Sequence, residues 1–252
     1  MRVTWWGHST VAIEDRGVRL LTDPVLRGRL GHLRRRRGRT PTLDLVAPDA
    51  VLVSHLHADH LDVVSLRRLD GSVRLIVPRG AGAFLRQVDA GLSRRCEEIV
   101  AGEEITIGTV RVRAVPANHG AARGPWSRHR APALGYTVHG DHTAWFAGDT
   151  DLFDGMGELG PLDVALIPVG GWGPTLGRGH LDPGAAAEAV RRSAPAWAVP
   201  IHFGTFWPIG CERVRPDRFH APGDEFATLA AGVAPSTRVR VLDPGESLEP
   251  LA

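Results

Sequence analysis

Short apolar runs separated by Gly, Pro and Asp recur from the start of the chain and predict β-strands joined by tight turns. Three such runs open the chain, at residues 3–6, 9–14 and 18–22. The segment Asp15-Arg16-Gly17 supplies the hairpin turn between the second and third runs. A fourth run, residues 50–53, is followed by a helical pattern over residues 61–69. Strands that alternate with helices in this way predict an α/β fold.

The same alternation continues to the end of the chain. Further strands are expected at residues 75–77, 103–107, 110–115, 134–138, 143–147, 162–169, 196–201 and 238–242. Further helices are expected at residues 82–88, 184–192 and 222–229, with Asp182 as the cap and Pro183 as the start of the second. Two Arg-rich stretches, residues 26–48 and 120–132, show neither the hydrophobic period of a helix nor that of a strand, and we expect them to be loops. No low-complexity linker divides the chain, so we expect one domain over residues 1–252.

Composition changes this picture little. With 252 residues, 43% hydrophobic and 23% charged, the chain is long enough to bury a substantial core. A net charge of +2 gives no overall field toward a nucleic acid or a membrane, so neither partner is expected. No run approaches the roughly 20 apolar residues of a membrane span, and the start lacks the regions of a secretory signal. Two cysteines are too few for a disulfide framework, and we expect a cytoplasmic protein.

The densest candidate chemistry lies directly after the run at residues 50–53. The segment HLHADH, residues 55–60, holds three imidazoles and a carboxylate, which are usual ligands for zinc, manganese or iron. At the end of an extended strand, His55 and His57 point to the same side. Asp59 and His60 follow at the turn before the expected helix and can reach a second position. The spacing therefore favours two metals over one.

Three more polar side chains follow expected strands: His119, Asp149 and His202. As a ligand, Asp149 would bridge two metals through its two oxygens; otherwise it would cap the next turn. His180, just before the helix start at Asp182, is either a loop residue or a group that reaches into the site. His8, in the turn after the first strand, could lie near the metals or be an ordinary loop residue. The sequence favours neither interpretation.

Arginines gather between residues 26 and 48, among them Arg34 and Arg36. Such a run is either a solvated loop or a flap whose guanidinium groups attract a phosphate or carboxylate of the substrate. Nucleic acid is a third use of such a patch. Trp172, in the Gly-rich loop after residues 162–169, is a further candidate for contact with substrate.

The segment HLHADH resembles the H-x-H-x-D-H signature of the metallo-β-lactamase-fold hydrolases, and His119, Asp149 and His202 follow in that superfamily's order. The segments WWGHSTVAIE, LLTDPV, GHLDPGAAAEAV and VPIHFGTF look most like the branch that contains N-acylphosphatidylethanolamine-hydrolysing phospholipase D and its bacterial relatives. L-ascorbate-6-phosphate lactonase is a more distant cousin in that branch. The resemblance implies a four-layer αβ/βα sandwich, with two mixed sheets, helices outside and the metals at one edge between the sheets.

The resemblance also implies a ligand set of seven residues. One metal would be held by His55, His57 and His119. The other would be held by Asp59, His60 and His202, with Asp149 bridging. The metals would be two divalent cations, zinc or manganese first, with iron also compatible. Asp59 would orient the nucleophile and take its proton, and His180 would face the substrate. The remaining candidates for substrate contact are His8, Arg34, Arg36 and Trp172.

The leading functional hypothesis is a dinuclear metal-dependent hydrolase whose metal-bridged hydroxide attacks a phosphodiester bond of a small anionic substrate. A lactone, or another carboxylic ester or amide, is the alternative for the same site. A non-catalytic metal-binding or regulatory protein is a lesser alternative. A processing nuclease would need an RNA-binding arm, and a flavodiiron oxygen reductase a flavin domain, for which we expect no space in 252 residues. A homo-oligomer is compatible with the sequence.

Overall fold

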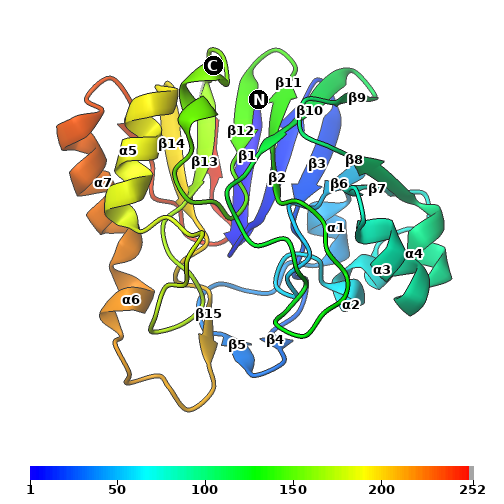
Figure 1. Cartoon of the computed structure of the whole chain (residues 1–252). Helices are drawn as coiled ribbons and strands as arrows, with labels where there is room; N and C mark the ends of the chain where they lie inside the picture. Colours follow the sequence, from blue (N-terminus) through cyan, green and yellow to red (C-terminus); the bar gives the residue numbers. More distant parts are fainter. Residues whose placement is uncertain (250–252) are drawn as a thin grey trace.

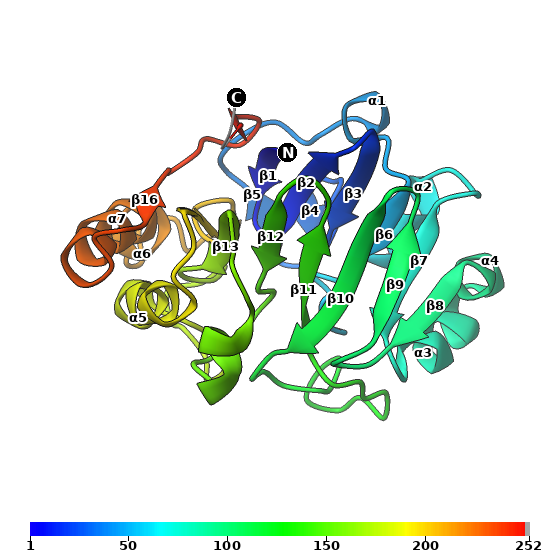
Figure 2. The same ribbon diagram turned by 90° about the horizontal axis from the view of Figure 1, so that it is seen from above.

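The computed structural model describes residues 1–249, and its framework is a pair of seven-stranded sheets that pack face to face (Figures 1 and 2). The first sheet has the order β17-β1-β2-β3-β6-β7-β8. Its strands are Ser247–Leu248, Arg2–Gly7, Thr10–Asp15, Val18–Thr22, Ala50–Leu52, Arg74–Pro78 and Cys96–Ile99. Strands β1, β2 and β3 are antiparallel, whereas β3, β6, β7 and β8 run parallel, so the sheet is mixed.

The second sheet repeats this plan, with the order β16-β14-β13-β12-β11-β10-β9. Its strands are Arg238–Val239, Trp197–Ile201, Val164–Pro168, Thr143–Phe146, Leu134–His139, Val110–Pro116 and Glu104–Ile107. Strands β9 to β12 are antiparallel, and β12, β13, β14 and β16 are parallel. In each sheet the parallel strands deliver their carboxyl ends to one edge, where ligand sites of such folds form.

The core lies between the two sheets. Trp5 and Leu20 from the first sheet belong to the same buried apolar cluster as Trp145 and Leu166 from the second. The alternation along a strand decides this arrangement, because Leu20 points between the sheets and Leu21 points to the outer face. Truncation of a fully buried residue such as Leu166 to Ala should cost about 2–5 kcal/mol.

Helices cover both outer faces, which completes four layers (Figure 2). Helices α2 (Val63–Arg68), α3 (Ala81–Val88) and α4 (Ala90–Arg94) cover the first sheet, and α5 (Pro183–Ser193) and α7 (Pro222–Val233) cover the second. Asp182 caps α5 through Ala185 N, and Pro183 begins the helix, as the sequence predicts. The expected α/β four-layer sandwich is confirmed, whereas the expectation of one domain stays a prediction.

A third, small sheet corrects the expectation that residues 26–48 form only a loop. Strands β4 (Arg29–Leu30) and β5 (Leu33–Arg35) form a hairpin, and β15 (Phe206–Pro208) pairs with β5. Leu30 and Leu33 are buried with Phe206, and the guanidinium of Arg35 lies 4.9 Å from the centroid of the Phe206 ring. Strands this short carry no visible period, so only contacts with β15 reveal them.

Other short elements were not predicted from the sequence. They are α4, β8, α1 (Leu43–Val46), the 3-10 helix η1 (Asp154–Glu158), α6 (Asp217–His220) and β17. The expected final strand at residues 238–242 is only the two-residue β16. Within residues 1–249, every helix is too short or too polar to cross a lipid bilayer.

Candidate metal centre

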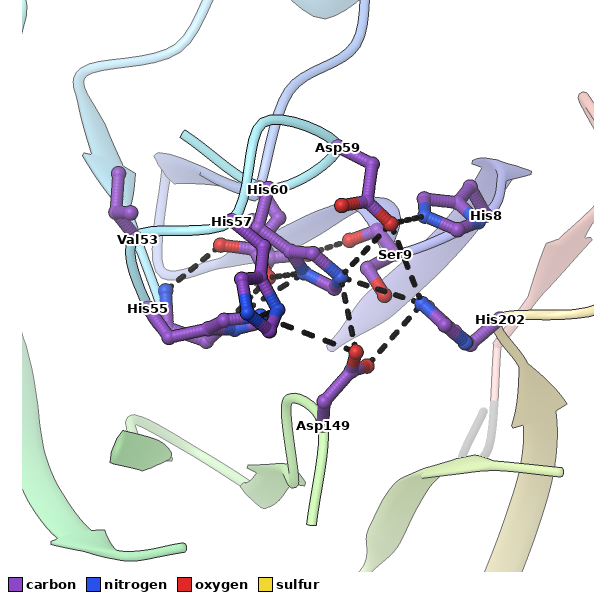
Figure 3. Close-up of polar contacts among 12 residues, drawn as sticks. His8, Ser9, Val53, His55, His57, Asp59, His60, Asp149 and His202 are labelled. Carbon is purple, nitrogen blue, oxygen red and sulfur yellow. Dashed lines mark hydrogen bonds and ion pairs between the residues drawn. The ribbon is translucent and has the colours of Figure 1, made fainter. Parts of the chain in front are cut away.

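The candidate site lies at the edge where the strands of both sheets end (Figure 3). The segment with His55, His57, Asp59 and His60 follows β6. Side chains from four other strand ends join it: His8 after β1, His119 after β10, Asp149 after β12 and His202 after β14. The two sheets therefore bring together residues that are up to 194 positions apart in the sequence.

The turn that carries Asp149 depends on Gly148. This glycine has a φ of +63°, and a Cβ at its position would lie 2.7 Å from the Cβ of Ser54 and 2.9 Å from the carbonyl oxygen of Leu134. Only glycine fits a left-handed position so close to a neighbouring backbone. Gly148 thus allows the second sheet to approach the segment after β6 and delivers Asp149 to the histidines.

His55, His57 and His119 form the outer cluster. His57 Nδ1 lies 2.9 Å from His55 Nε2 and 3.1 Å from His119 Nε2. His55 is fully buried, whereas His57 and His119 are half-buried. The Nδ1 of His119 lies 2.7 Å from the carbonyl oxygen of Gly179, which therefore accepts a hydrogen bond from this ring. The Nε2 atom of His119 then keeps its lone pair and faces the other two rings.

His8, Asp59, His60 and His202 form the inner cluster, and all four residues are buried. The Nε2 atoms of His60 and His202 are 3.2 Å apart. Asp59 Oδ2 lies 3.5 Å from His60 Nε2 and 3.9 Å from His202 Nε2. The Nδ1 of His202 lies 2.8 Å from the carbonyl oxygen of Gly170, so this ring also turns its Nε2 inward.

Asp149 lies between the two clusters (Figure 3). Its Oδ2 is 3.9 Å from His55 Nε2 in the outer cluster and 3.1 Å from His60 Nε2 in the inner cluster. Its Oδ1 is 3.2 Å from His202 Nε2, yet this buried oxygen makes no hydrogen bond among the described residues. A buried oxygen without a hydrogen-bond partner is costly unless a cation satisfies it.

The electrostatics of the site fit a bound cation. Burial opposes the positive charge on His60, but the carboxylates of Asp149, Asp59 and Asp23 outweigh it and raise the pKa of His60 well above its usual value. Burial likewise opposes ionisation of Asp59 and Asp149, but neighbouring imidazoles outweigh it and hold both carboxyl pKa values well below the usual range. Several buried carboxylates thus require a neighbouring positive charge. A divalent metal bound by these N and O donors would supply it.

The histidines of the outer cluster behave differently. Burial lowers the pKa of His55 well below its usual range and that of His57 to about 4. Burial is also the main cause that lowers the pKa of His119. These rings are neutral near pH 7, and neutral imidazole is the form that binds metal.

Two further site residues, Asp23 and Ser54, were not recognised from the sequence. Asp23 Oδ2 lies 2.7 Å from His60 Nδ1 and accepts a hydrogen bond from Ser54 Oγ at 2.5 Å. Ser54 Oγ is in turn 2.9 Å from His55 Nδ1. Asp23 therefore supports a histidine of the inner cluster directly and one of the outer cluster through Ser54. Its position at the end of β3 is the signal that could have identified it, as it identified Asp149.

Of the residues expected to contact substrate, His180 lies nearest to the clusters' shared carboxylate. His180 Nε2 is 3.3 Å from Asp149 Oδ2, and its side chain is 19% exposed. Trp172 is 36% exposed, and its ring packs edge-on against His32 with centroids 5.2 Å apart. His8 is buried and contacts Asp59. The substrate roles of all three stay predictions.

Arg34 and Arg36 are exposed and lie beside the loop after β15. Backbone hydrogen bonds and then these two arginines lower the pKa of Glu212 in that loop. The guanidinium of Arg36 is 5.3 Å from the centroid of the Phe219 ring. Between them, the buried Arg35 donates a hydrogen bond to the carbonyl oxygen of Trp6, so its role is in the fold. The substrate roles of Arg34 and Arg36 also stay predictions.

Comparisons with known proteins agree with this geometry. Residues 18–203 match the family model described as a beta-lactamase superfamily domain. A UPF0173 metal-dependent hydrolase of Methanopyrus kandleri is 32% identical over 263 residues, which cover 99% of this chain and 100% of that protein. An N-acyl-phosphatidylethanolamine-hydrolyzing phospholipase D of Caenorhabditis elegans is 31% identical over 230 residues, which cover 82% of this chain and 64% of that protein.

A solved structure supports the fold independently. Igni18, a metallo hydrolase from the archaeon Ignicoccus hospitalis, superimposes with a TM-score of 0.73 at 24% identity, and the match covers 98% of this chain and 97% of Igni18. Three observations agree on the family of this chain. They are the sequence match over most of its length, the sandwich of two mixed sheets and the His/Asp clusters at the strand ends. The chain belongs to the metallo-β-lactamase superfamily, in the branch of the UPF0173 metal-dependent hydrolases.

Proposed function

We propose that this protein is a dinuclear metal-dependent hydrolase that cleaves a phosphodiester bond in a small anionic substrate. The observation that carries the proposal is the position of Asp149, whose two carboxylate oxygens lie within 3.9 Å of ring nitrogens in both clusters. A carboxylate shared by two sets of N and O donors is typical of two-metal hydrolytic sites. The relatives named as a metal-dependent hydrolase and a phospholipase D support the reaction class.

In this proposal, His55, His57 and His119 would hold one divalent cation. Asp59, His60 and His202 would hold the other, and the two sets would share Asp149. Zinc and manganese are the preferred metals, and iron is compatible with the same donors. When bound, such cations lower the pKa of water and stabilise the charge that develops on the phosphate.

Asp59 acts as the base that orients the nucleophilic water and accepts its proton. Its carboxyl pKa lies well below the usual range, because the neighbouring imidazoles outweigh the effect of burial. The group is therefore ionised at neutral pH and available as an acceptor. Asp59 and Asp149 contact the ring nitrogens of the same two histidines, His60 and His202, from opposite sides (Figure 3).

His180 donates a hydrogen bond or a proton to the leaving oxygen. Burial opposes its charge, but its hydrogen bond to Asp149 outweighs that effect and raises the pKa of the imidazole. A protonated His180 has two N–H donors: Nδ1 faces the carbonyl oxygens of Gly177 and Arg178, and Nε2 faces Asp149 on a side chain that is 19% exposed. Such a donor stabilises negative charge as it develops in the transition state.

The charge at this end of the molecule supports an anionic substrate. The connections at residues 24–42, 117–133, 169–181 and 203–216 carry seven, three, one and two arginines, and their only acidic residue is Glu212. All leave strands at the edge with the His/Asp clusters (Figure 1). Arg35 and Arg123 are committed to backbone carbonyls, and Arg27 and Arg37 pair with carboxylates. The other arginines add positive charge to these four connections, and positive charge near a site raises the encounter rate of anions.

The proposal is tested by hydrolysis of a chromogenic phosphodiester and of a lactone panel, with protein loaded separately with zinc and with manganese. Asp59→Asn serves as the inactive variant. Asp141→Asn is the matched control, because Asp141 is an exposed carboxylate paired with Arg16 far from the clusters. Phosphodiester turnover that disappears only in Asp59→Asn supports the proposal. Turnover of lactones alone would favour the carboxylic ester alternative, and silence on both with two bound metals would favour a non-catalytic role.

A further inference from the structure

His8 makes a contact that the proposed reaction does not yet use. Its Nε2 lies 2.9 Å from Asp59 Oδ2, and the residue is only 1% exposed. A carboxylate oxygen accepts hydrogen bonds, so the Nε2 of His8 is the atom that donates in this contact. A charge-assisted hydrogen bond of this kind is among the stronger interactions available to a buried carboxylate.

The backbone of His8 is held as firmly as its ring. Its N–H donates to Thr205 Oγ1 at 2.8 Å, and its carbonyl oxygen accepts from the indole of Trp5 at 2.8 Å. The same carbonyl accepts from the backbone N–H of His202 at 3.0 Å. His8 has a φ of 54° and His202 a φ of 61°, a strained conformation for both, which these contacts maintain.

The ring of His8 also packs against its neighbours. It lies over the ring of His202, with centroids 4.1 Å apart and planes at 34°. The ring of Phe206 meets it edge-on at 5.6 Å. One residue thus contacts Asp59 through its Nε2 and His202 through both its ring and its backbone (Figure 3).

We propose that His8 is a positioning residue that holds Asp59 and His202 in the geometry the inner metal requires. The hydrogen bond from Nε2 occupies one lone pair of Asp59 Oδ2 and leaves the other lone pairs of the carboxylate for the metal and for the proton of the nucleophile. A buried ring between His202 and Phe206 has no path to substrate, so this role replaces the substrate contact expected from the sequence. The inference rests on the proposed function of the inner cluster, but its main test needs no substrate.

The test compares His8→Phe, which keeps a ring but removes the donor, with His8→Gln, which keeps a donor. Metal-free protein is titrated with Co²⁺, and the visible absorption of the bound ion reports each binding event. Loss of a hydrogen bond that orients a metal ligand typically costs about 10–100-fold in affinity or activity. His8→Phe should weaken one binding event by about that factor and leave the other within about twofold. His8→Gln should recover most of the loss, and His139→Phe, distant from both clusters, is the control.

The kinetic expectation separates positioning from substrate binding. With the phosphodiester, His8→Phe should lower kcat and leave KM within about twofold, because only the alignment of Asp59 changes. The proposal would be overturned if His8→Phe and His8→Gln had the same Co²⁺ affinity and the same kcat. It would also be overturned if His8→Phe raised KM and left kcat and Co²⁺ binding unchanged. If wild-type protein cleaves no phosphodiester, the proposed function fails, while the Co²⁺ titration still decides the role of His8.

A measurement on the wild-type protein covers the case in which His8→Phe does not fold. In ¹⁵N-histidine spectra of the metal-free protein, His8 should show a protonated Nε2 whose hydrogen exchanges slowly with solvent. In Asp59→Ala this hydrogen should exchange faster, because its acceptor is gone. An Nε2 that carries no proton in the wild type would overturn the proposal.

Discussion

The outer cluster consists of three histidines, the inner cluster of three histidines and one carboxylate, and the two clusters also differ in how they are supported. In the outer cluster, His57 and His119 are half-buried, and a backbone carbonyl orients His119. In the inner cluster every member is buried, the carboxylate of Asp23 contacts His60, and the ring of His8 contacts Asp59 within the cluster. The outer cluster contains only neutral imidazoles, whereas the inner cluster contains the ionised Asp59. The comparison teaches that burial and carboxylate charge together make the inner cluster the one that requires a cation.

A difference in metal affinity follows from this comparison. Asp149 contacts both clusters, but only the inner cluster contains a carboxylate of its own and has every member buried. Charge attraction is stronger where water is excluded. We therefore expect the inner site to bind divalent metal more tightly and the outer site to exchange its metal first.

The largest effect should come from Asp149→Asn. This change removes the one carboxylate that both clusters share, while the size of the side chain is kept. Both metal sites should weaken, and turnover should fall by more than the about 100-fold that the loss of a supporting hydrogen bond costs. Metal content by atomic absorption and turnover on the phosphodiester measure the two effects. Retention of both metals at wild-type affinity would remove the bridging role.

Asp23→Asn should have the next largest effect. The change weakens the support of His60 and, through Ser54, that of His55, so both binding events should lose about 10–100-fold in affinity. Ser54→Ala is the matched comparison, because it removes the contact to His55 Nδ1, the hydrogen bond to Asp23 and a longer contact to His60 Nδ1 at 3.5 Å. The direct contact between Asp23 and His60 remains in this variant. In Ser54→Ala, isothermal titration with zinc should show a larger loss of affinity at the outer site, which binds more weakly, than at the inner site. An equal shift of both events would contradict the separation of the clusters.

Stability of the metal-free protein should depend on pH in opposite ways for His60 and His57. The pKa of His60 is raised above its ordinary value of 6.5, so its stabilising contribution is complete below pH 6.5 and is lost as the pH rises through the raised pKa. The pKa of His57 is lowered from 6.5 to about 4, so the unfolded chain binds more protons between these values. Stability should therefore fall as the pH falls from 6.5 toward about 4.

Urea unfolding in the presence of a chelator measures both effects. His60→Gln should flatten the loss of stability on the alkaline side, and His57→Gln should remove part of the loss on the acid side. The other neutral histidines, such as His202, account for the rest of the acid side. A change on the alkaline side in His57→Gln would show that the charges of the two clusters are not separate.

The smallest effect is expected outside both clusters. The double substitution Arg34→Ser and Arg36→Ser removes two exposed charges near Glu212. Exposed charge interactions are worth about 0.2–1 kcal/mol, so KM for an anionic substrate should rise about two- to fivefold with kcat unchanged. A neutral ester is the control substrate. An unchanged KM for the anion would return these arginines to the interpretation as a solvated surface.

Local patterns predict most strands, the principal helices and the positions of the candidate ligands, whereas the arrangement of the strands in two mixed sheets is implied by the resemblance to a known superfamily. Apolar runs mark the strands, and the rule that polar groups gather at strand ends is enough to select His55, His119, Asp149 and His202. The resemblance to a known superfamily then sorts the same residues into two groups. Nothing in this step requires knowledge of long-range contacts.

The supporting contacts could not be predicted, because they join distant segments. The hydrogen bond from His8 reaches Asp59 across 51 positions, and the contact between Asp23 and His60 spans 37. The third sheet pairs Phe206 with Arg35, and its strands are two or three residues long, too short for a period to appear. In the same way, the burial of Arg35 within an Arg-rich run depends on Phe206 and cannot be inferred from composition.

The central claim is that the two clusters form two metal sites that share Asp149. The most direct test is a calorimetric titration of metal-free protein with Zn²⁺, repeated with Asp149→Asn. The account predicts two equivalents bound with separable affinities in the wild type, and a loss of affinity in both events in the variant. Saturation of the wild type at one equivalent, or a variant in which only one of two events changes, would contradict it.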